Sequence, residues 1–507
     1  MAETGRRRAA FGKTTLAAGL GLFLCGGPAT AAPDWKLMDL RTKLAALAAT
    51  LKTDDDARSL PVSALVAGLE GYVRHIPWQT TGTFAEPTGP ATIGWTDTRF
   101  ALATLSQVLG GEDNLAVVQA SGANGTDAIR VEAGVVTLDQ LRSRMTNRFV
   151  GRDIETGADL LRIPLVIGED ATLRLGPGDA LMLSRRDGAF IVSYGRIEVF
   201  GAEISASAEP SEANEEYVPF IASVGSGSVH LSNATLKHLG FGNTEKFSGL
   251  SILAYPTMRP ANRTVIENTR FEDMVTLALV GVTDAEMNGN RFFDMRRNPL
   301  LLSHSPNALI AGNLFTGNSP TNAIRVSNGS GGTEVTGNVI LEGSRAGLLI
   351  SSGSDNVSVN GNLIWRRNGG GVKLQGVACG RVVMNVILDD KQKGIEVRNS
   401  KDAFVHANTI VGNKNAGVWV SGQKKGEVTY ITDNLLRENG SGLTTAAGAA
   451  IALKGNDLSN QFPRLLDGDI TQQFRAVIAD LRGEAPILLD AGGAVPTERL
   501  APAACAL

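Results

Sequence analysis

An asparagine closes a short apolar segment again and again between Asn233 and Asn439. Successive members of this series are 22, 23, 25, 24, 23, 23 and 26 residues apart. A fixed period in this range is typical of solenoids, in which each repeat packs only on its neighbours. Each repeat is too short for a pair of helices, and core segments such as GVKLQG and GIEVRNS alternate in polarity. The pattern therefore predicts one turn of a parallel β-helix per repeat. The series comprises Asn268, Asn290, Asn313, Asn338, Asn362, Asn385, Asn408 and Asn434.

The asparagines are expected to stack at one turn of the solenoid. Asparagine tolerates left-handed backbone angles and hydrogen-bonds to nearby backbone groups. Stacked coils also leave a long, regular flank that suits a long, linear ligand. The formal net charge of −3 argues against a general attraction to nucleic acid. The sequence has no metal-spaced Cys/His cluster, phosphate loop or nucleophile elbow, so neither a metal nor another cofactor is expected.

The N-terminus has the pattern of a signal peptide over residues 1–32. Arg6 to Arg8 and Lys13 give a positive start, an apolar run follows from Leu16 to Cys25, and small residues end the segment. The run is shorter than the roughly 20 residues of a transmembrane helix, so no membrane span is expected in the mature chain. The predicted location is periplasmic or secreted. Two cysteines, Cys379 and Cys505, then remain far apart in the sequence and are expected to be unpaired thiols.

The rest of the 507-residue chain divides into three predicted parts. Residues 33–150 are expected to be mainly helical, with apolar residues at helical spacing from Leu37 to Leu51, further stretches at 65–73 and 99–109, and a capping box at Thr137. These helices are expected to cap the open end of the solenoid. Alternating strands begin near residue 161, so the β-helix is assigned to 151–440. Residues 441–507 form an extension with one helix at 472–481.

Strand alternation predicts which side chains leave the core. In the repeat strands the aliphatic residues two positions apart must face inward, so the residues between them face outward on one flank. Cations and one indole ring dominate this outward set, which suits carboxylates and sugar faces. The alternative is an ordinary solvated face of mixed charge. The predicted binding residues are Arg325, Lys373, Gln375, Glu396, Arg398 and Trp419.

Six segments between about residue 160 and residue 440 follow one another in a specific order and spacing. They are ATLRL, LMLSRRDGAFIV, VPFIASVGSGSVHLSN, LKHLGFGNTEKFSGLSILAYP, GIEVRNS and AGVWVSG. In this order the chain resembles the periplasmic mannuronan C5-epimerases of alginate-producing bacteria. The resemblance implies an all-β, right-handed parallel β-helix with a helical N-terminal region, export from the cytoplasm, and a polyuronate ligand.

The catalytic residues of that family do not carry over directly. Epimerisation removes the C5 proton next to a carboxylate, which needs a base, a cation and a proton donor. The family uses an Asp-Pro-His motif and an arginine one coil later; Leu300–Leu302 and Asn328 occupy those places here. The nearest substitutes are His304 as base and Arg325 as the cation, with Tyr255 as the acid. The alternatives are a turn histidine and a packed tyrosine.

These observations leave two classes of function open. The first is an enzyme on an acidic exopolysaccharide, either an epimerase with a diverged centre or a lyase, because elimination starts with the same proton abstraction. The second is a polysaccharide-binding or export-guiding protein without activity, which the missing Asp-Pro-His motif favours. An acidic polysaccharide is the expected partner, and other exopolysaccharide export proteins are a further candidate.

Overall fold

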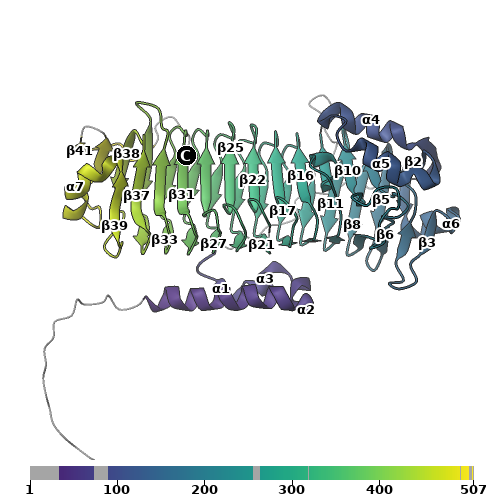
Figure 1. The fold of residues 1–507 in the computed structure, drawn as a ribbon, viewed down its shortest axis with the longest axis horizontal. Helices are drawn as coiled ribbons and strands as arrows, with labels where there is room; N and C mark the ends of the chain where they lie inside the picture. Colours follow the sequence, from purple (N-terminus) through teal and green to yellow (C-terminus); the bar gives the residue numbers. More distant parts are fainter. Residues whose placement is uncertain are drawn as a thin grey trace, which may run out of the picture.

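The computed structural model describes residues 34–73, 89–254, 263–317, 319–490, 493–501 and 505. The predicted signal peptide and Tyr255 lie outside these residues. A long solenoid occupies most of the chain, with short helical elements on its sides and ends (Figure 1). Each coil consists of three strands, and each strand pairs in parallel with its equivalent in the next coil. The predicted parallel β-helix is confirmed.

The strands form three walls, numbered in the order in which the chain visits them. Corner 1 joins wall 1 to wall 2, corner 2 joins wall 2 to wall 3, and corner 3 leads back to wall 1. Wall 1 consists of the first part of β5 (Leu165–Leu175), β7 (Ile191–Ser193), β10 (Ile221–Val224), β13 (Gly249–Leu253), β16 (Thr276–Val280), β19 (Leu300–Ser303), β22 (Ile324–Ser327), β25 (Leu348–Ser351), β28 (Val372–Gln375), β31 (Lys393–Arg398), β34 (Ala416–Ser421), β37 (Ser441–Ala446) and β39 (Arg464–Gly468).

Walls 2 and 3 have the same construction. Wall 2 consists of the last part of β5, β8 (Arg196–Phe200), β11 (Ser228–Ser232), β14 (Val265–Glu267), β17 (Glu286–Asn288), β20 (Leu309–Ala311), β23 (Glu334–Thr336), β26 (Ser358–Asn360), β29 (Arg381–Val383), β32 (Phe404–His406), β35 (Val428–Thr432) and β38 (Ala450–Lys454). Wall 3 consists of β4 (Asp159–Leu161), β6 (Ala180–Leu183), β9 (Glu203–Ala206), β12 (Thr235–Lys237), β15 (Arg270–Glu272), β18 (Arg291–Phe293), β21 (Leu314–Thr316), β24 (Val339–Leu341), β27 (Leu363–Trp365), β30 (Val386–Leu388), β33 (Thr409–Val411) and β36 (Leu435–Arg437).

Aliphatic side chains from all three walls fill one continuous core. On wall 1, Val326, Ile350 and Leu374 lie in register on successive strands, and each is fully buried. A column of five glycines lies where successive coils enter wall 1, at Gly347, Gly371, Gly394, Gly417 and Gly442. A Cβ at Gly371 would stand 2.5 Å from Ile387 Cγ2, and one at Gly394 would stand 2.5 Å from Ile410 Cγ2. The glycine that opens GVKLQG and GIEVRNS therefore makes room for the isoleucine of wall 3.

Buried asparagines stack at corner 2. The backbone N–H and the side-chain Nδ2 of Asn290 both donate to Asn313 Oδ1, at 2.8 and 3.0 Å. The same two bonds recur in each coil through Asn434, which donates to Asn456. The predicted ladder is confirmed from Asn290 to Asn434.

Asn268 is an exception, and its predicted place in the ladder is wrong. Thr269 occupies the buried turn position, where its N–H donates to Asn290 Oδ1 at 3.0 Å. Asn268 lies one residue earlier with a left-handed φ of 45° and donates instead to Asn233 Oδ1.

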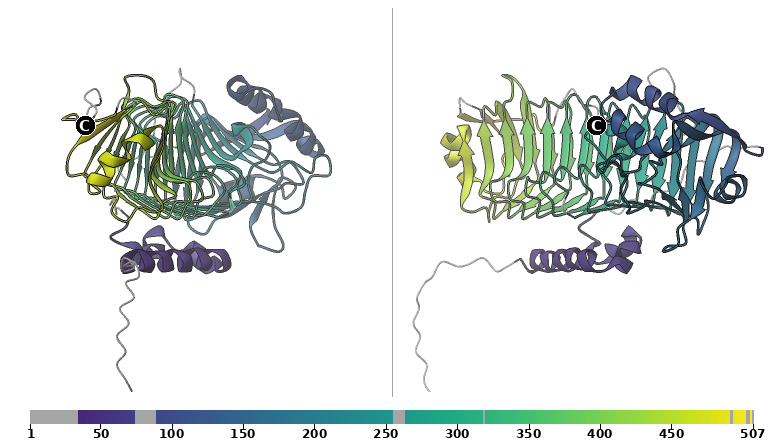
Figure 2. Two further views of the ribbon diagram at one scale, coloured as in Figure 1. Left: turned by 60° about the vertical axis from the view of Figure 1, so that its left-hand side comes forward. Right: turned by 45° about the vertical axis from the view of Figure 1, so that its right-hand side comes forward.

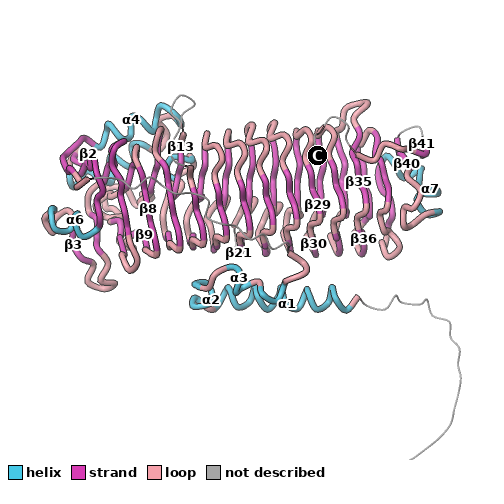
Figure 3. The backbone as a smooth tube through the Cα atoms, turned by 180° about the vertical axis from the view of Figure 1, so that it is seen from behind, coloured by secondary structure: helices cyan, strands magenta, loops and turns pink. Residues whose placement is uncertain are grey.

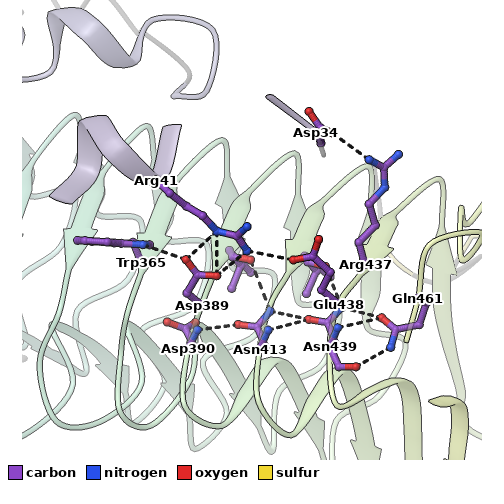
Figure 4. Close-up of polar contacts among 12 residues, drawn as sticks. Asp34, Arg41, Trp365, Asp389, Asp390, Asn413, Arg437, Glu438, Asn439 and Gln461 are labelled. Atoms are coloured by element: carbon purple, nitrogen blue, oxygen red, sulfur yellow. Dashed lines mark hydrogen bonds and ion pairs between the residues drawn. The ribbon is translucent and has the colours of Figure 1, made fainter. Parts of the chain in front are cut away.

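A second polar ladder lies at corner 3 and was not predicted. Asp390, Asn413, Asn439 and Gln461 occupy equivalent buried positions in successive coils. Asn439 Nδ2 donates to Gln461 Oε1 at 3.0 Å, and Asn413 Nδ2 donates to Asn439 Oδ1 at 2.9 Å (Figure 4). The two ladders satisfy backbone N–H groups that the corners would otherwise bury without partners.

The first helical segment lies along the side of the solenoid (Figures 1 and 2). It contains α1 (Trp35–Thr53), α2 (Asp55–Ser59), α3 (Val62–Leu65) and the 3₁₀ turn η1 (Ala67–Leu69). The apolar stripe of α1 packs on the outer face of wall 3, so this segment does not cap the solenoid as expected. The reason is that wall 3 carries a row of outward apolar side chains, which α1 shields from water. The predicted helix at 65–73 is reduced to short turns.

Ion pairs hold α1 to the edge of wall 3. Arg41 pairs with Asp389 at 2.7 Å and with Glu438 at 3.3 Å, and Arg437 pairs with Asp34 at 2.9 Å (Figure 4). Both ends of the segment contribute, because Arg58 pairs with Glu272 at 2.6 Å. The helix is therefore fixed by charge as well as by apolar contact.

The second segment, 89–152, lies at the N-terminal end of the solenoid. It contains β1 (Thr92–Asp97), α4 (Thr98–Leu109), α5 (Asn114–Ala120), η2 (Ser121–Asn124), β2 (Asp127–Thr137), α6 (Leu138–Arg144) and β3 (Val150–Arg152). The predicted helix at 99–109 and the capping box at Thr137 are confirmed. The strand β2 pairs in parallel with β5, and the helices α4 and α5 cover the outer face of wall 1 over its first coils.

The C-terminal end is closed by η4 (Asp469–Gln473), α7 (Phe474–Ala479) and the antiparallel strands β40 (Ile487–Asp490) and β41 (Gly493–Pro496). The chain then returns along the solenoid, where Arg499 lies 5.7 Å from the ring of Tyr430. Cys379 and Cys505 form a disulfide, which corrects the expectation of two free thiols. The return of the tail brings together cysteines that are 126 residues apart. None of the helices within the described residues has the length and apolar character needed to cross a bilayer.

Candidate functional site

The outer face of wall 1 carries every described residue that the sequence predicted for binding (Figure 3 gives the opposite view of the solenoid). Strand pairing aligns one outward row along the solenoid and a second row next to it. The first row is Leu301, Arg325, Leu349, Lys373, Glu396, Trp419 and Thr444. The second row is Ser351, Gln375, Arg398, Ser421 and Ala446. Equivalent residues of neighbouring coils are about 4.8 Å apart, so the rows form a continuous surface.

A charge cluster occupies the middle of this face. Glu396 lies between two lysines, 3.2 Å from Lys393 and 3.7 Å from Lys373. The ammonium group of Lys393 also lies 4.2 Å from the centre of the Trp419 ring. Cation–π contact and ion pairing together hold the four side chains in place. Sequence reasoning missed Lys393 because strand alternation assigns its position to the inward side of β31, whereas its ammonium group lies beside Glu396 and Trp419.

Two cations on the same face lie apart from the carboxylates of the described residues. Arg325 and Arg398 are exposed, and neither forms an ion pair with a carboxylate of the described residues. Because a guanidinium group binds carboxylates through two parallel hydrogen bonds, both side chains are available to an acidic ligand. Gln375 lies next to Arg398 in the second row and adds a neutral donor and acceptor.

His304 does not follow the strand alternation used to predict its direction. The strand β19 ends at Ser303, and His304 has a left-handed φ of 53°. Its exposed ring shares a hydrogen bond with Ser303 Oγ, at 3.1 Å from Nδ1. Arg325 pairs with Leu301, three residues before His304, which corresponds to about 10 Å along a strand. The two predicted catalytic groups thus lie on neighbouring coils without direct contact.

The strands of wall 1 that precede Arg325 carry small or apolar outward residues in place of ionisable groups. Ala278 is fully buried, and Leu301 is 6% exposed. Within strands β13, β16 and β19, no outward residue is a histidine, aspartate, glutamate, lysine or arginine. Tyr255 follows β13 but lies outside the described residues. Among the residues that the structure describes, no group of three or more His, Cys, Asp or Glu side chains is arranged to hold a metal.

The fold and this face define a right-handed parallel β-helix protein with one open, charged wall. A family model described as the right-handed β-helix region matches residues 220–364. A second model, described as the periplasmic copper-binding protein NosD, matches residues 353–474.

The sequence relatives are mannuronan C5-epimerases, so the predicted resemblance is confirmed. The enzyme of Pseudomonas putida is 27% identical over 62% of this chain and 63% of its own length. That of Pseudomonas aeruginosa is 29% identical over 62% and 60%, and that of Azotobacter vinelandii is 28% identical over 58% of each chain. The chain thus spans about three fifths of the relatives' length.

A solved structure supports the fold. The periplasmic alginate epimerase AlgG superimposes with a TM-score of 0.61 at 19% identity, over 76% of this chain and 94% of that chain. At this identity the similarity concerns the fold alone.

Proposed function

We propose that this protein acts on an acidic exopolysaccharide of the alginate type and that it resembles a C5-epimerase in activity. One observation carries the proposal: the outer face of wall 1 presents Arg325 and Lys373 in its first row, in register with the indole ring of Trp419, and Arg398 in the adjacent second row. The curated relatives are named for the same polymer chemistry. In this proposal the polymer lies along wall 1, its carboxylates contact the cations, and a sugar face rests on Trp419.

The proposed chemistry is a transfer of the C5 proton. His304 takes the proton from one face of the sugar ring, and Arg325 neutralises the carboxylate where negative charge accumulates. Tyr255 returns a proton to the opposite face, so the product differs only in its configuration at C5.

A second candidate is a protein that binds the polysaccharide without changing it. The observation that favours it is the apolar character of Leu300–Leu302, where the epimerase family has its Asp-Pro-His motif. A lyase is the other enzymatic outcome, because elimination begins with removal of the same proton.

The deciding experiment incubates the protein with polymannuronate in D₂O. Deuterium at C5 with inverted configuration in the NMR spectrum would establish an epimerase, whereas an unsaturated product that absorbs in the ultraviolet would establish a lyase. Exchange that His304→Ala abolishes and Ser303→Ala retains would assign the base. Binding without exchange on any polyuronate would leave the second candidate.

The same proposal includes a periplasmic or secreted location. The N-terminal pattern of a signal peptide supports it. The Cys379–Cys505 disulfide supports it too, because such bonds persist in oxidising compartments. Partners among exopolysaccharide export proteins are part of the proposal as well. Trp35 and Met38 on α1, which are 70% and 55% exposed, offer them an apolar contact. Cross-linking in cells that is lost with Trp35→Ser tests this contact.

A further inference from the structure

Corner 3 contains a hollow of about 530 Å³ that belongs to neither outward row of wall 1. Three cations line it: Arg366, Lys391 and Lys414. Lys391 and Lys414 occupy equivalent positions in successive coils, since their N–H groups donate to Arg367 O and Asp390 O at 2.8 and 2.9 Å. The two lysines therefore extend from backbone positions about one coil spacing, 4.8 Å, apart.

None of these three cations forms an ion pair with a carboxylate of the residues that the structure describes. Lys391 and Lys414 are exposed and take part in no ion pair there, and the Arg366 guanidinium lies 4.2 Å from the Trp365 ring centre. The hollow also contains two acidic groups, Glu342 and Asp389. Those two would cancel much of the positive charge if they were free.

The helix α1 neutralises both acidic groups. Lys52 pairs with Glu342 at 2.6 Å, and Arg41 pairs with Asp389 at 2.7 Å (Figure 4). Gly412 leaves space for the second pair, because a Cβ there would collide with Asp389 Oδ1. With both carboxylates occupied by α1, the three remaining cations determine the sign of the hollow.

A buried guanidinium beneath the hollow adds to this positive charge. Arg367 is 2% exposed and donates to the backbone carbonyls of Thr321, Glu342 and Arg345. Burial lowers the pKa of Arg367 to about 10, which still leaves it charged at neutral pH. The neighbouring Asp390 is fully buried, and burial raises its pKa well above the usual range, so it is a weak counter-charge.

We propose that corner 3 is a second binding track for acidic polysaccharide, and that docking of α1 makes it positive. The chemical class of the ligand is a polyanion with carboxylates in a row, which matches cations repeated at the coil spacing. The identity of the polymer rests on the proposed function. The track itself rests on residues that the wall 1 site does not use.

The test measures binding of a fluorescent polymannuronate oligomer to the mature chain at low salt. Lys391→Glu/Lys414→Glu is expected to weaken binding about tenfold, and added salt should remove the difference. The matched control is Lys424→Glu/Lys425→Glu, which makes the same charge change at exposed residues of corner 1. Equal affinity of the two variants would overturn the inference.

Arg41→Gln tests the role of α1. It leaves Asp389 without its partner and is expected to weaken binding about threefold without removing any residue that lines the hollow. Adding Asp389→Asn to this variant should restore affinity, because the uncompensated carboxylate is then gone. A loss that Asp389→Asn does not rescue would contradict an electrostatic role for Arg41.

The wall 1 variant Lys373→Glu/Arg398→Glu separates this inference from the proposed function. Loss of binding in this variant, with normal binding by Lys391→Glu/Lys414→Glu, would retain wall 1 and reject corner 3. The reverse pattern would retain corner 3 and reject wall 1. Unchanged binding in both variants would reject both sites.

Discussion

Walls 1 and 3 are built from strands of the same kind, but their outer faces differ in character: that of wall 3 is apolar and covered, and that of wall 1 is charged and open. On wall 3 the outward residues include Phe293, Leu341 and Trp365, all fully buried beneath α1. On wall 1 the corresponding positions after β19 carry Arg325 and Lys373, which are exposed or half-buried. The comparison shows that the coil determines where a side chain points, whereas the residue type determines whether that face is covered or left for a ligand.

A substitution at the centre of α1 should disrupt the contact between this helix and wall 3. Leu44 is fully buried against wall 3, and Leu44→Asp is expected to weaken docking of the helix by about 3–5 kcal/mol, because it places an unpaired charge in an apolar contact. Limited trypsin digestion should then cleave after Lys43 or Lys52. Ala46→Asp on the exposed side of α1 is the control. Equal protection of the two variants would show that apolar contact with wall 3 does not hold α1.

The corner 2 ladder lies between wall 2 and wall 3, so its loss should destabilise the solenoid as a whole and not one outer face. Asn362 Oδ1 accepts from Asn338 Nδ2 at 2.8 Å, and its Nδ2 donates to Val335 O at 2.9 Å. Asn362→Ala leaves these buried groups unsatisfied and is expected to lower the free energy of unfolding by about 3 kcal/mol. Urea denaturation measures the loss. Asn360→Ala, two residues earlier, should cost less than about 1 kcal/mol.

The corner 3 ladder under α1 contains one acidic member whose removal should stabilise the chain. Burial raises the pKa of Asp390 well above its usual range, and its Oδ2 has no hydrogen-bond partner among the described residues. The folded chain thus holds this proton more tightly than the unfolded chain. The resulting stability is fully present below the unfolded pKa near 3.9 and is lost as pH rises towards the folded pKa.

Asp390→Asn should remove that pH dependence. An amide reproduces the bonds that Asn413 and Asn439 make in the next coils, so stability at pH 7 is expected to rise by about 1–3 kcal/mol. Urea denaturation at pH 4 and pH 7 measures both effects. A lower stability of this variant at pH 7 would mean that the ionised carboxylate is favourable there.

The smallest expected effect concerns the open face. Trp419→Ala should weaken binding of a polymannuronate oligomer about fivefold, close to 1 kcal/mol, because it removes the ring on which the proposed function places a sugar face. Leu349→Ala, on the same row, removes apolar area without a ring and should change affinity less than twofold. Titration calorimetry compares the two. Matching losses would indicate that apolar area alone matters on wall 1.

The sequence predicted those features that repeat in every coil. Alternation assigned the outward positions of Arg325 and Trp419, because each of these residues lies between two aliphatic core residues of its strand. Spacing found the asparagine ladder because seven coils keep the same residue type. Both signals are local, so one sequence was enough to show them.

Features that do not repeat the same residue type in successive coils were not visible in the sequence. The corner 3 ladder escaped notice because Asp390, Asn413 and Gln461 differ in type. The left-handed backbone at His304 was not assigned, because a residue type that tolerates this conformation does not by itself specify it. The disulfide and the place of α1 depend on where distant segments return, which periodicity does not encode.

The position of α1 imposes an order on folding. This helix is near the start of the chain, yet Arg41 contacts Asp389, 348 residues later, and Asp34 contacts Arg437, 403 residues later. Contacts this distant form late, because the intervening coils must stack first. A chain that crosses a membrane from its N-terminus would therefore release α1 first and dock it last. Until the final coils arrive, the apolar row of wall 3 is uncovered, and α1 is free to contact whatever assists the chain at that stage.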